Sequence, residues 1–391
     1  MNKQIVILGG GYAGLMAAAR AARTPAAQVT LVDAAPHFTQ RIRLHEALAG
    51  AEPRTLAYAP LLARRGIRFL QGRVAELDPL RQRLSGQAAS GTPFALDYDL
   101  LILALGSSII ADLPGVAEHA LRLDSQQTMR QASAQVRGLA AAQGRMLVVG
   151  GGLTGIETAT ELVERHPSLR VTLATRDVLG AGYAPAAQAH LHARLAQLGV
   201  ELIEHAVVTG LEPGRALLGG GAALPFDLCV WSGGMRAAPL GRAAGLAVDQ
   251  LGRVLADPTL QTPAFPNILA AGDAAAPQIG FDVRMSCASA MPMGAQAGDN
   301  ARRLLAGHTP EPLAFGFTGR CISLGRTGGL IQFTTADDTA RPQVWSGRRA
   351  VITKELVCRM TTLVIRQELR TGWSLYRWPG SPELRGVGVE A

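Results

Sequence analysis

The chain has 391 residues, of which 48% are hydrophobic and 17% charged, and this is enough for two or three cores of ordinary size. Its net charge of +8 comes from arginines scattered among few aromatic residues, which argues against a nucleic-acid partner, and its four cysteines are spaced too widely for a metal site or a disulfide scaffold. The first apolar run is too short for a secretory signal and none approaches the roughly 18 residues of a membrane span, so we expect a cytoplasmic protein.

The first residues have the pattern of a strand, a glycine turn, a helix and a second strand. Residues 4–8 and 29–32 are short apolar runs typical of buried strands, and the Ala-rich stretch 15–23 predicts a helix. The turn reads Gly9-Gly10-Gly11-Tyr12-Ala13-Gly14, which satisfies GxGxxG, and Asp33 ends the second strand.

Each part of this motif has a physical role. Gly9 permits the tight turn, and Gly14 lets the helix pack closely on the strand. Gly11 lets a pyrophosphate approach the backbone at the helix N-terminus, which carries partial positive charge. Asp33 can accept hydrogen bonds from the hydroxyls of an adenosine ribose. The segment is therefore predicted to bind the ADP part of a dinucleotide.

A second unit of the same kind follows. A strand over residues 146–149, a helix over 156–165 and a strand over 170–174 surround Gly150-Gly151-Gly152-Leu153-Thr154-Gly155. The apolar strands 98–106 and 226–234 come after the first and second units, and we expect each to mark a crossing between domains. The chain is thus a loose internal duplication with two nucleotide-binding modules.

The second module lacks the acid of the first. Its second strand ends in Ala174-Thr175-Arg176. A carboxylate there would favour the free 2′-hydroxyl of NADH, whereas Thr175 and Arg176 could receive the 2′-phosphate of NADPH. Arg176 could equally be a solvated turn residue in a protein that uses NADH, so the choice between the two nucleotides stays open.

The remaining chain contains one more nucleotide-type turn. Residues 267–276 (NILAAGDAAA) predict a buried strand that runs into a turn at Gly272 and Asp273. A helix is predicted from about Pro292 to Leu305, because proline is favourable in the first turn of a helix. Beyond residue 310 no glycine-rich phosphate motif occurs, and strands with one helix are expected.

The ordered motifs GGGYAGL, LILALG, VVGGGLTGIETATEL and NILAAGDAA resemble the two-dinucleotide-binding flavoprotein superfamily with the pyridine nucleotide-disulfide oxidoreductase fold. Over residues 3–330 the chain is similar to the type II NADH dehydrogenase-like branch. The resemblance implies an α/β fold of two Rossmann-like domains and a C-terminal α+β cap. The FAD domain would span residues 1–114 and 262–309, the NAD(P)H domain 115–261 and the cap 310–391.

The resemblance also implies which residues bind the cofactors, FAD and either NADH or NADPH. Residues expected at FAD are Gly9, Gly11, Tyr12, Ala13, Gly14, Asp33, Arg43, Val74, Ala104, Gly106, Gly272, Asp273 and Pro292. Residues expected at NAD(P)H are Gly150, Gly152, Gly155, Glu157, Thr175, Arg176 and Gly233. The N-terminus of the helix near Pro292 would face the flavin and stabilise negative charge on it. No metal is expected.

Arg43 and Glu157 are the candidate catalytic residues. Disulfide reductases of this superfamily carry CxxxxC in the region of residues 38–48, which here has no cysteine, so electrons are expected to leave the flavin directly. Among the charged residues there (Arg41, Arg43, His45 and Glu46), Arg43 is preferred as a cation near the isoalloxazine, with cover of a helix face as the alternative. Glu157 could orient the nicotinamide or accept a proton, or only be stabilised near a helix N-terminus. Cys287 is expected to be a structural thiol.

The resemblance implies hydride transfer from NAD(P)H to flavin N5 and then electron transfer to a quinone or another small acceptor. The alternatives are a reductase for a protein carrier such as ferredoxin or rubredoxin, and a slow redox sensor.

Residues 351–370 predict an amphipathic helix, and its apolar face is Ile352, Leu356, Val357, Met360, Leu363 and Val364. With the aromatic tail at Trp373, Tyr376 and Trp378, this face could contact the inner face of the membrane, a second subunit or the protein's own body.

Overall fold

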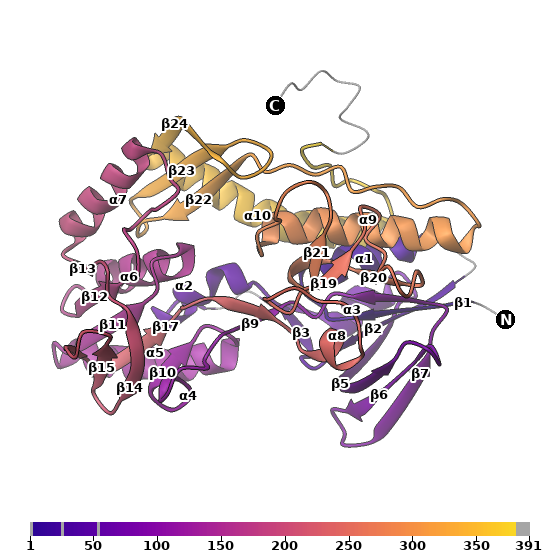
Figure 1. Cartoon of the computed structure of the whole chain (residues 1–391), viewed down its shortest axis with the longest axis horizontal. Helices are drawn as coiled ribbons and strands as arrows, with labels where there is room; N and C mark the ends of the chain where they lie inside the picture. Colours follow the sequence, from indigo (N-terminus) through magenta and orange to yellow (C-terminus); the bar gives the residue numbers. More distant parts are fainter. Residues whose placement is uncertain (1–2, 25–26, 53–54, 381–391) are drawn as a thin grey trace.

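The computed structural model describes residues 3–24, 27–52 and 55–380, and its two largest sheets lie next to each other along the molecule (Figure 1). The first has the order β20-β8-β1-β2-β5-β6-β7, and β20 joins β8 although the whole second sheet lies between them in sequence. Its strands are β1 Lys3–Leu8, β2 Ala27–Asp33, β5 Arg68–Asp78, β6 Arg83–Ala88, β7 Pro93–Asp97, β8 Leu100–Leu103 and β20 Ile268–Ala270. The second, all-parallel sheet contains β10 Ala120–Arg122, β17 Leu228–Trp231, β11 Arg145–Val149, β12 Arg170–Ala174 and β13 Glu201–Ile203, in that spatial order.

Helices surround both sheets. They are α1 Tyr12–Ala21, α2 Leu44–Leu48, α3 Tyr58–Ala63, α4 Val116–His119, α5 Gln126–Ala141, α6 Leu153–Arg165, α7 Pro185–Leu198, α8 Leu240–Ala243, α9 Cys287–Leu305, α10 Arg348–Thr371 and the one-turn helices η1 Arg41–Arg43 and η2 Gly272–Ala274. The shorter strands are β3 His37–Thr39, β4 Thr55–Ala57, β9 Ser107–Ile109, β14 Val208–Glu212, β15 Arg215–Leu218, β16 Ala223–Pro225, β18 Met235–Ala237, β19 Val254–Ala256, β21 Ala275–Pro277, β22 Gly319–Ser323, β23 Gly329–Thr334 and β24 Ala340–Ser346. The segments that directly follow the two predicted crossings pair with each other, since β9 and β18 are antiparallel partners.

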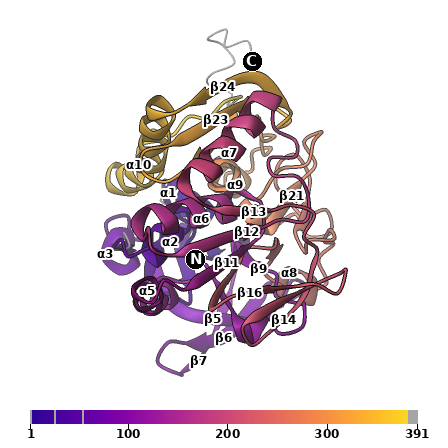
Figure 2. The ribbon, with the colours of Figure 1, turned by 90° about the vertical axis from the view of Figure 1, so that its left-hand side faces the viewer.

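The two glycine motifs confirm the predicted strand-turn-helix units. Both helices begin three residues earlier than predicted, at Tyr12 and Leu153, because each follows directly on a glycine N-cap inside its motif. In the second sheet, Met146 and Val148 of β11 face a core that contains α5, α6 and α7, while Leu147 faces the β14-β15-β16 sheet (Figure 2). The strand is thus buried on both faces, as its continuous apolar run predicts.

Helix α9 packs against α1 at very short range, because both helices are rich in small residues. A Cβ at Gly294 would lie 2.1 Å from the Ala13 carbonyl oxygen, and one at Gly298 would lie 2.5 Å from that of Ala17. The predicted start of this helix at Pro292 is wrong. The side chain of Ser286 caps a helix that begins at Cys287, and Pro292 lies buried inside it.

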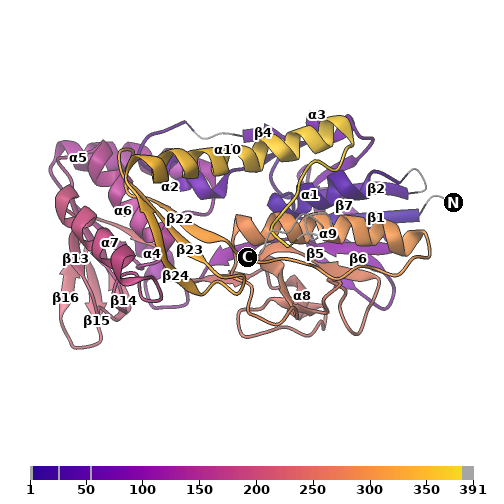
Figure 3. The ribbon, with the colours of Figure 1, turned by 90° about the horizontal axis from the view of Figure 1, so that it is seen from above.

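The C-terminal part is the expected cap of strands and one helix. Strands β22, β23 and β24 form an antiparallel sheet, and α10 runs across the top of the molecule toward α3 (Figure 3). Arg20 of α1, which is 2% exposed, fastens α10 through a 2.6 Å ion pair with Glu368 and bonds Asp299 of α9 at 2.7 Å. The cap is therefore tied to the first module by buried charges. Residues 381–391 lie outside the described residues.

The sequence correctly predicted helix α10 and left three possible partners for its apolar face, namely the membrane, a second subunit or the protein's own body. Five residues of the predicted face, Ile352, Leu356, Val357, Met360 and Leu363, are 46–57% exposed, whereas Val364 is half-buried and packs against the core of the first module. Most of this face therefore does not dock on the described part of the chain. The helix packs inward with another face, which contains Ala350, Cys358, Thr361, Ile365, Glu368 and Leu369. Trp373 is 72% exposed, whereas Trp378 is buried and donates to the Ala314 carbonyl oxygen. Among the described residues, no helix is long and apolar enough to cross a membrane.

Candidate functional site

The first glycine turn has the shape of a dinucleotide cradle. Gly9 has a φ of +98°, and a Cβ there would lie 2.3 Å from the Ala104 carbonyl oxygen. A Cβ at Gly14 would lie 1.8 Å from the Gly9 carbonyl oxygen, so the helix can approach the strand only because residue 14 is glycine. At Gly11, in contrast, no atom of the described residues lies within 4 Å of a Cβ. The turn is closed toward the protein and open where a pyrophosphate would approach.

Asp33 holds the same turn from the end of β2. Its two carboxylate oxygens accept the N–H groups of Gly10 and Ala35 at 2.6 and 2.7 Å. Burial raises the pKa of Asp33, and these two backbone hydrogen bonds oppose the rise. Tyr58 was not predicted from the sequence, and its hydroxyl donates to the Gly10 carbonyl oxygen at 2.7 Å. Asp33 and Tyr58 together fix the turn next to the predicted ribose position.

Next to this turn, at the ends of β8 and β20, lie the predicted FAD residues Ala104, Gly106, Gly272 and Asp273. Gly106 follows β8, and the Ser107 hydroxyl donates to Asp273 at 2.6 Å. Gly272, with a φ of +68°, packs so closely on Ala13 that a Cβ would lie 2.8 Å from its methyl group. Val74 lies half-buried on β5, opposite Gly86 of β6. Because the carboxyl ends of parallel strands meet at one edge, this is where an α/β fold holds a ligand.

Tyr12 is 8% exposed and packs edge to face against Phe38. Its hydroxyl lies near Thr361 and Cys358 of α10 and Cys287 of α9, and burial raises its pKa well above the usual value. The open backbone at Gly11 and the acid at Asp33 fit FAD, which would supply the two-electron redox chemistry.

The second turn repeats the first almost atom for atom. A Cβ at Gly155 would lie 1.8 Å from the Gly150 carbonyl oxygen, and one at Gly152 would meet no described atom within 4 Å. Thr175 stands where Asp33 stands in the first module, since a Cβ at Gly151 would lie 2.3 Å from its hydroxyl oxygen. The missing acid is therefore a feature of the folded site as well as of the sequence.

Arg176 and Gly233 border the second turn in different ways. The Arg176 side chain is exposed and forms no hydrogen bond or ion pair with any described residue. Gly233 is also exposed, and a Cβ there would lie 2.7 Å from the Trp231 ring. Trp231 in turn donates to the Ile110 carbonyl oxygen at 2.7 Å and anchors the crossing between the sheets. Arg176 is thus available to a ligand, while Gly233 makes room for Trp231.

Arg43 lies in the interior, at the end of η1. It is 8% exposed, and its guanidinium bonds Glu46 at 2.8 Å and Glu355 of α10 at 2.7 Å. Burial alone would lower the pKa of Arg43, but these carboxylates outweigh it and raise the pKa. Its Nε has no partner among the described residues. The residue is more than cover for a helix face, because it joins α2 to the C-terminal helix.

Glu157 is buried where α2, α6, β22 and α10 meet. One of its oxygens pairs with the Lys354 ammonium and accepts the Ser323 N–H at 3.0 Å. The other lies 3.8 Å from Nδ1 of His45, which is 4% exposed. Glu157 therefore faces a cluster that includes the C-terminal helix, a position that proximity to the helix N-terminus alone does not explain.

Lys354 is the functional candidate that the sequence reasoning missed. Burial lowers its pKa to about 8, so it can both hold and release a proton near neutral pH. Burial and the nearby cations, Lys354 first, lower the pKa of His45 well below its usual value, so that imidazole is neutral. A cavity of about 40 Å³ beside Lys354 is lined by Arg43 and Cys358 among others. Only two of the 38 basic residues are lysines, and that rarity was the available signal.

None of the cysteines has the properties of a reactive thiol. Cys287, predicted to be structural, is the first residue of α9, and burial raises its pKa to about 12. Burial also raises the pKa of Cys321 to about 11. All four cysteines are free thiols. Thiols with such raised pKa values are poor nucleophiles at neutral pH.

Comparison with known proteins agrees with these features. Residues 3–296 match the pyridine nucleotide-disulphide oxidoreductase family. A NADH dehydrogenase-like protein of Mycobacterium tuberculosis is 30% identical over 90% of this chain and 92% of its own length. The demethylphylloquinone reductase of Synechocystis sp. is 28% identical over 84% of this chain and 86% of its own length.

Solved structures share the whole architecture. The NDH2 of Plasmodium falciparum in complex with NADH has a TM-score of 0.79 at 13% identity and covers 95% of this chain and 97% of its own. A ferredoxin reductase from Rhodopseudomonas palustris has a TM-score of 0.71 at 24% identity, over 85% of this chain and 83% of its own. The chain belongs to the pyridine nucleotide-disulphide oxidoreductase family, as a FAD-dependent NAD(P)H oxidoreductase of the type II NADH dehydrogenase-like branch that lacks the redox-active CxxxxC.

Proposed function

We propose that this enzyme passes electrons from NAD(P)H to a quinone. Reduction of a quinone to a quinol consumes two protons, so the acceptor site needs a proton source that is shielded from water. The Glu157–Lys354 pair supplies one, and it lies buried beside the small cavity that Arg43 and Cys358 also line. This buried pair is the observation that carries the proposal. The names of the Synechocystis and Staphylococcus aureus relatives, both quinone-reducing enzymes, support it.

The residues around the pair have distinct parts to play in this proposal. Lys354, with a pKa of about 8, would donate a proton to the reduced acceptor, and Glu157 would hold Lys354 in place through their ion pair. Arg43 would keep a positive charge beside the site, because Glu46 and Glu355 hold its guanidinium. His45 would stay neutral and orient Glu157. In this scheme Arg43 and Glu157 act beside the acceptor, whereas the sequence predicted them beside the isoalloxazine and the nicotinamide.

Rapid mixing without oxygen tests the proposal. Flavin absorbance should bleach on addition of NAD(P)H and return at least 100-fold faster with a short-chain quinone than with oxygen. The rival is a reductase for an acidic protein carrier, favoured by the net charge of +8 and by the likeness to a ferredoxin reductase. Return of the colour only with ferredoxin, at a rate that falls with salt, would replace the quinone by that carrier. If no acceptor restores the flavin absorbance quickly, the protein would instead be a slow redox sensor.

Nucleotide preference should depend on Thr175 and Arg176. If Arg176 binds the 2′-phosphate of NADPH, Arg176→Ala removes a charge-assisted hydrogen bond of roughly 1.5 to 3 kcal/mol and should weaken NADPH at least tenfold while sparing NADH. Thr175→Asp copies Asp33 of the first module and should shift preference toward NADH. The measurement is the rate of flavin reduction at low nucleotide concentration. Arg165→Ala, at the exposed far end of α6, is the matched control, and a ratio unchanged in all variants would rule these residues out.

We also propose that the exposed face of α10 lies on an anionic membrane. Its apolar residues are flanked by the exposed arginines Arg359, Arg366 and Arg370, the combination expected of an interfacial helix. Leu356→Asp combined with Met360→Asp should reduce co-sedimentation with phosphatidylglycerol vesicles at least tenfold. Leu80→Asp, at a residue 85% exposed in the first module, should change nothing. Loss of a concentration-dependent dimer in place of vesicle binding would assign the face to a second subunit.

A further inference from the structure

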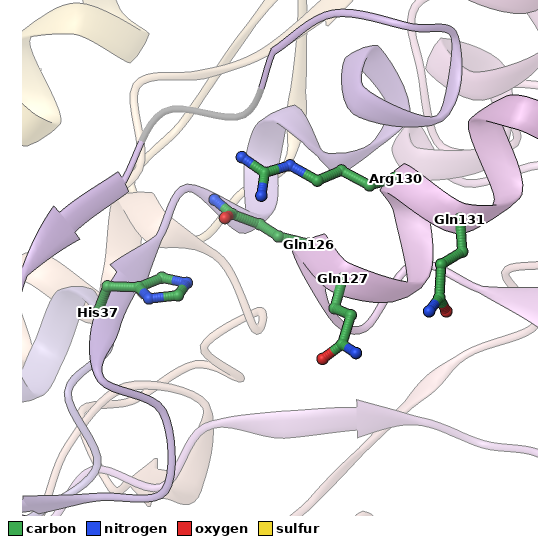
Figure 4. A pocket seen from close by; sticks show the side chains of 5 residues that line it. All are labelled: His37, Gln126, Gln127, Arg130 and Gln131. Carbon is green, nitrogen blue, oxygen red and sulfur yellow. The ribbon is translucent and has the colours of Figure 1, made fainter.

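A cavity of about 420 Å³ lies between β3 and the first turns of α5 (Figure 4). Its lining consists of His37, Gln126, Gln127, Arg130 and Gln131, and all five side chains are polar. The volume is within the usual range of small-molecule sites, about 300 to 1,000 Å³. β3 contributes to the core of the first module through Phe38, and α5 to that of the second through Met129. The cavity therefore lies at the junction of the two modules, and its residues have no role in the proposed quinone chemistry.

Gln126 is the side chain that points to a ligand. It is 6% exposed, yet its amide forms no hydrogen bond with any described residue. Figure 4 shows the amide directed from α5 across the opening toward His37. The amide atoms reach the solvent of the cavity and have no partner among the described residues, so they are free to donate and accept hydrogen bonds there. A polar group bound in the cavity would provide partners for both.

The charges around Gln126 select an anion. α5 is 16 residues long, and the hydroxyl of its N-cap Ser125 accepts the Thr128 N–H at 3.1 Å and shares a 2.7 Å hydrogen bond with the Thr128 hydroxyl. The first N–H groups of the helix, including that of Gln127, have no partner within it and carry the positive end of its dipole. Arg130 lies one turn further on, and Figure 4 shows its guanidinium on the same side as the Gln126 amide.

Arg130 is free enough to serve a ligand. Its one ion pair among the described residues is with Glu52 at 3.7 Å, and the two side chains are 61% and 91% exposed. Exposed ion pairs of this kind are weak, so a bound phosphate could replace Glu52 as the partner of the guanidinium at little cost in free energy. The amides of Gln127 and Gln131 lie on the cavity wall and offer both donors and acceptors for hydroxyl groups.

We propose that this cavity binds a small sugar phosphate. The phosphate is held by Arg130, the Gln126 amide and the N-terminal N–H groups of α5, and the sugar hydroxyls are held by Gln127, Gln131 and His37. A bound sugar phosphate contacts elements of both modules and therefore stabilises the protein against unfolding. The site is separate from the two glycine turns, and the inference does not depend on the identity of the electron acceptor.

Calorimetric titration of the FAD-saturated protein with ribose 5-phosphate tests the proposal. We expect one saturable site, a rise in the thermal unfolding midpoint, weaker binding of inorganic phosphate and no binding of ribose. Gln126→Ala and Arg130→Gln should each weaken ribose 5-phosphate at least tenfold. Arg137→Gln is the control on the same helix, because Arg137 bonds Ser133 and does not line the cavity, and it should bind like the parent.

Three outcomes overturn the inference. One is the lack of any heat or midpoint shift with ribose 5-phosphate at millimolar concentration. Another is ribose 5-phosphate binding that Gln126→Ala and Arg130→Gln leave unchanged, because the phosphate would then lie outside this cavity. Loss of binding in Gly152→Val would likewise overturn the inference, because the phosphate would then lie at the nucleotide turn. Flavin bleaching by NAD(P)H, measured in Gln126→Ala and Arg130→Gln, should stay normal. Failure of this site is thus distinguishable from failure of the proposed quinone reduction.

Discussion

Protein carrying Gly11→Val should fold and contain no FAD. The backbone at Gly11 has φ −69° and ψ −167°, which valine adopts freely, and a Cβ there meets no described atom within 4 Å. The only group that the isopropyl side chain would strike is the pyrophosphate that approaches this turn. Loss of the glycine N-cap should cost stability no more than about 1 kcal/mol. The purified protein should therefore be colourless after reconstitution while its circular dichroism matches the parent.

The duplication provides a matched control for this experiment. Gly152 has φ −77° and ψ 178° and the same open surroundings in the second module. Gly152→Val should give a yellow protein with full FAD that no longer bleaches with NAD(P)H at concentrations that saturate the parent. A yellow Gly11→Val protein would contradict the assignment of the first turn to FAD, and exchanged phenotypes would mean that the two modules had been assigned in reverse.

The parts of the fold that could be predicted from the sequence are those fixed by local chemistry. Gly9 and Gly14 are tied to each other within one turn, and Gly150 and Gly155 repeat the same contacts, so the motif alone specifies the geometry. Asp33 reaches the turn because the strand that carries it is parallel to β1 in a register set by six residue pairs. Periodicity and turn residues are therefore sufficient for both cradles.

Contacts between distant segments could not be predicted in this way. Lys354 and Glu157 are 197 residues apart, and Arg20 and Glu368 are 348 apart, so no spacing rule connects them. Local signals also conflicted. Pro292 resembled the first residue of a helix, although Ser286 offers a cap one and a half turns earlier, and the folded chain uses Ser286.

Helix α10 shows why apolar periodicity alone does not tell which face of a helix is buried. Its more hydrophobic face, with Leu356 and Met360, is exposed. The buried face carries Lys354 toward Glu157 and Glu368 toward Arg20, and such charges are placed inside only when a partner from another segment meets them. The sequence of the helix shows none of these partners.

Replacement of Lys354 should remove the proton source for the acceptor. In the parent enzyme the rate of quinone reduction should fall as pH rises through about 8, because Lys354 can donate only while it is protonated. Lys354→Arg keeps the positive charge beside Glu157 but does not release a proton below about pH 12. We expect its quinone reduction to be roughly 100-fold slower or more, and independent of pH between 7 and 10. The measurement is the turnover number with quinone across this pH range.

A variant without the positive charge distinguishes the role of Lys354 as a proton donor from its role in the ion pair with Glu157. Lys354→Met leaves Glu157 buried with only the Ser323 N–H and His45 beside it, so it should lower stability by about 3 to 5 kcal/mol as well as activity. Lys354→Arg should instead keep most of the stability while losing the pH dependence, a combination that a purely structural ion pair would not produce. Bleaching of the flavin by NAD(P)H should be normal in Lys354→Arg, since that step needs no proton from this side. If Lys354→Arg keeps the parent's fall in rate near pH 8, the proton comes from another group and Lys354 serves only to hold α10 in place.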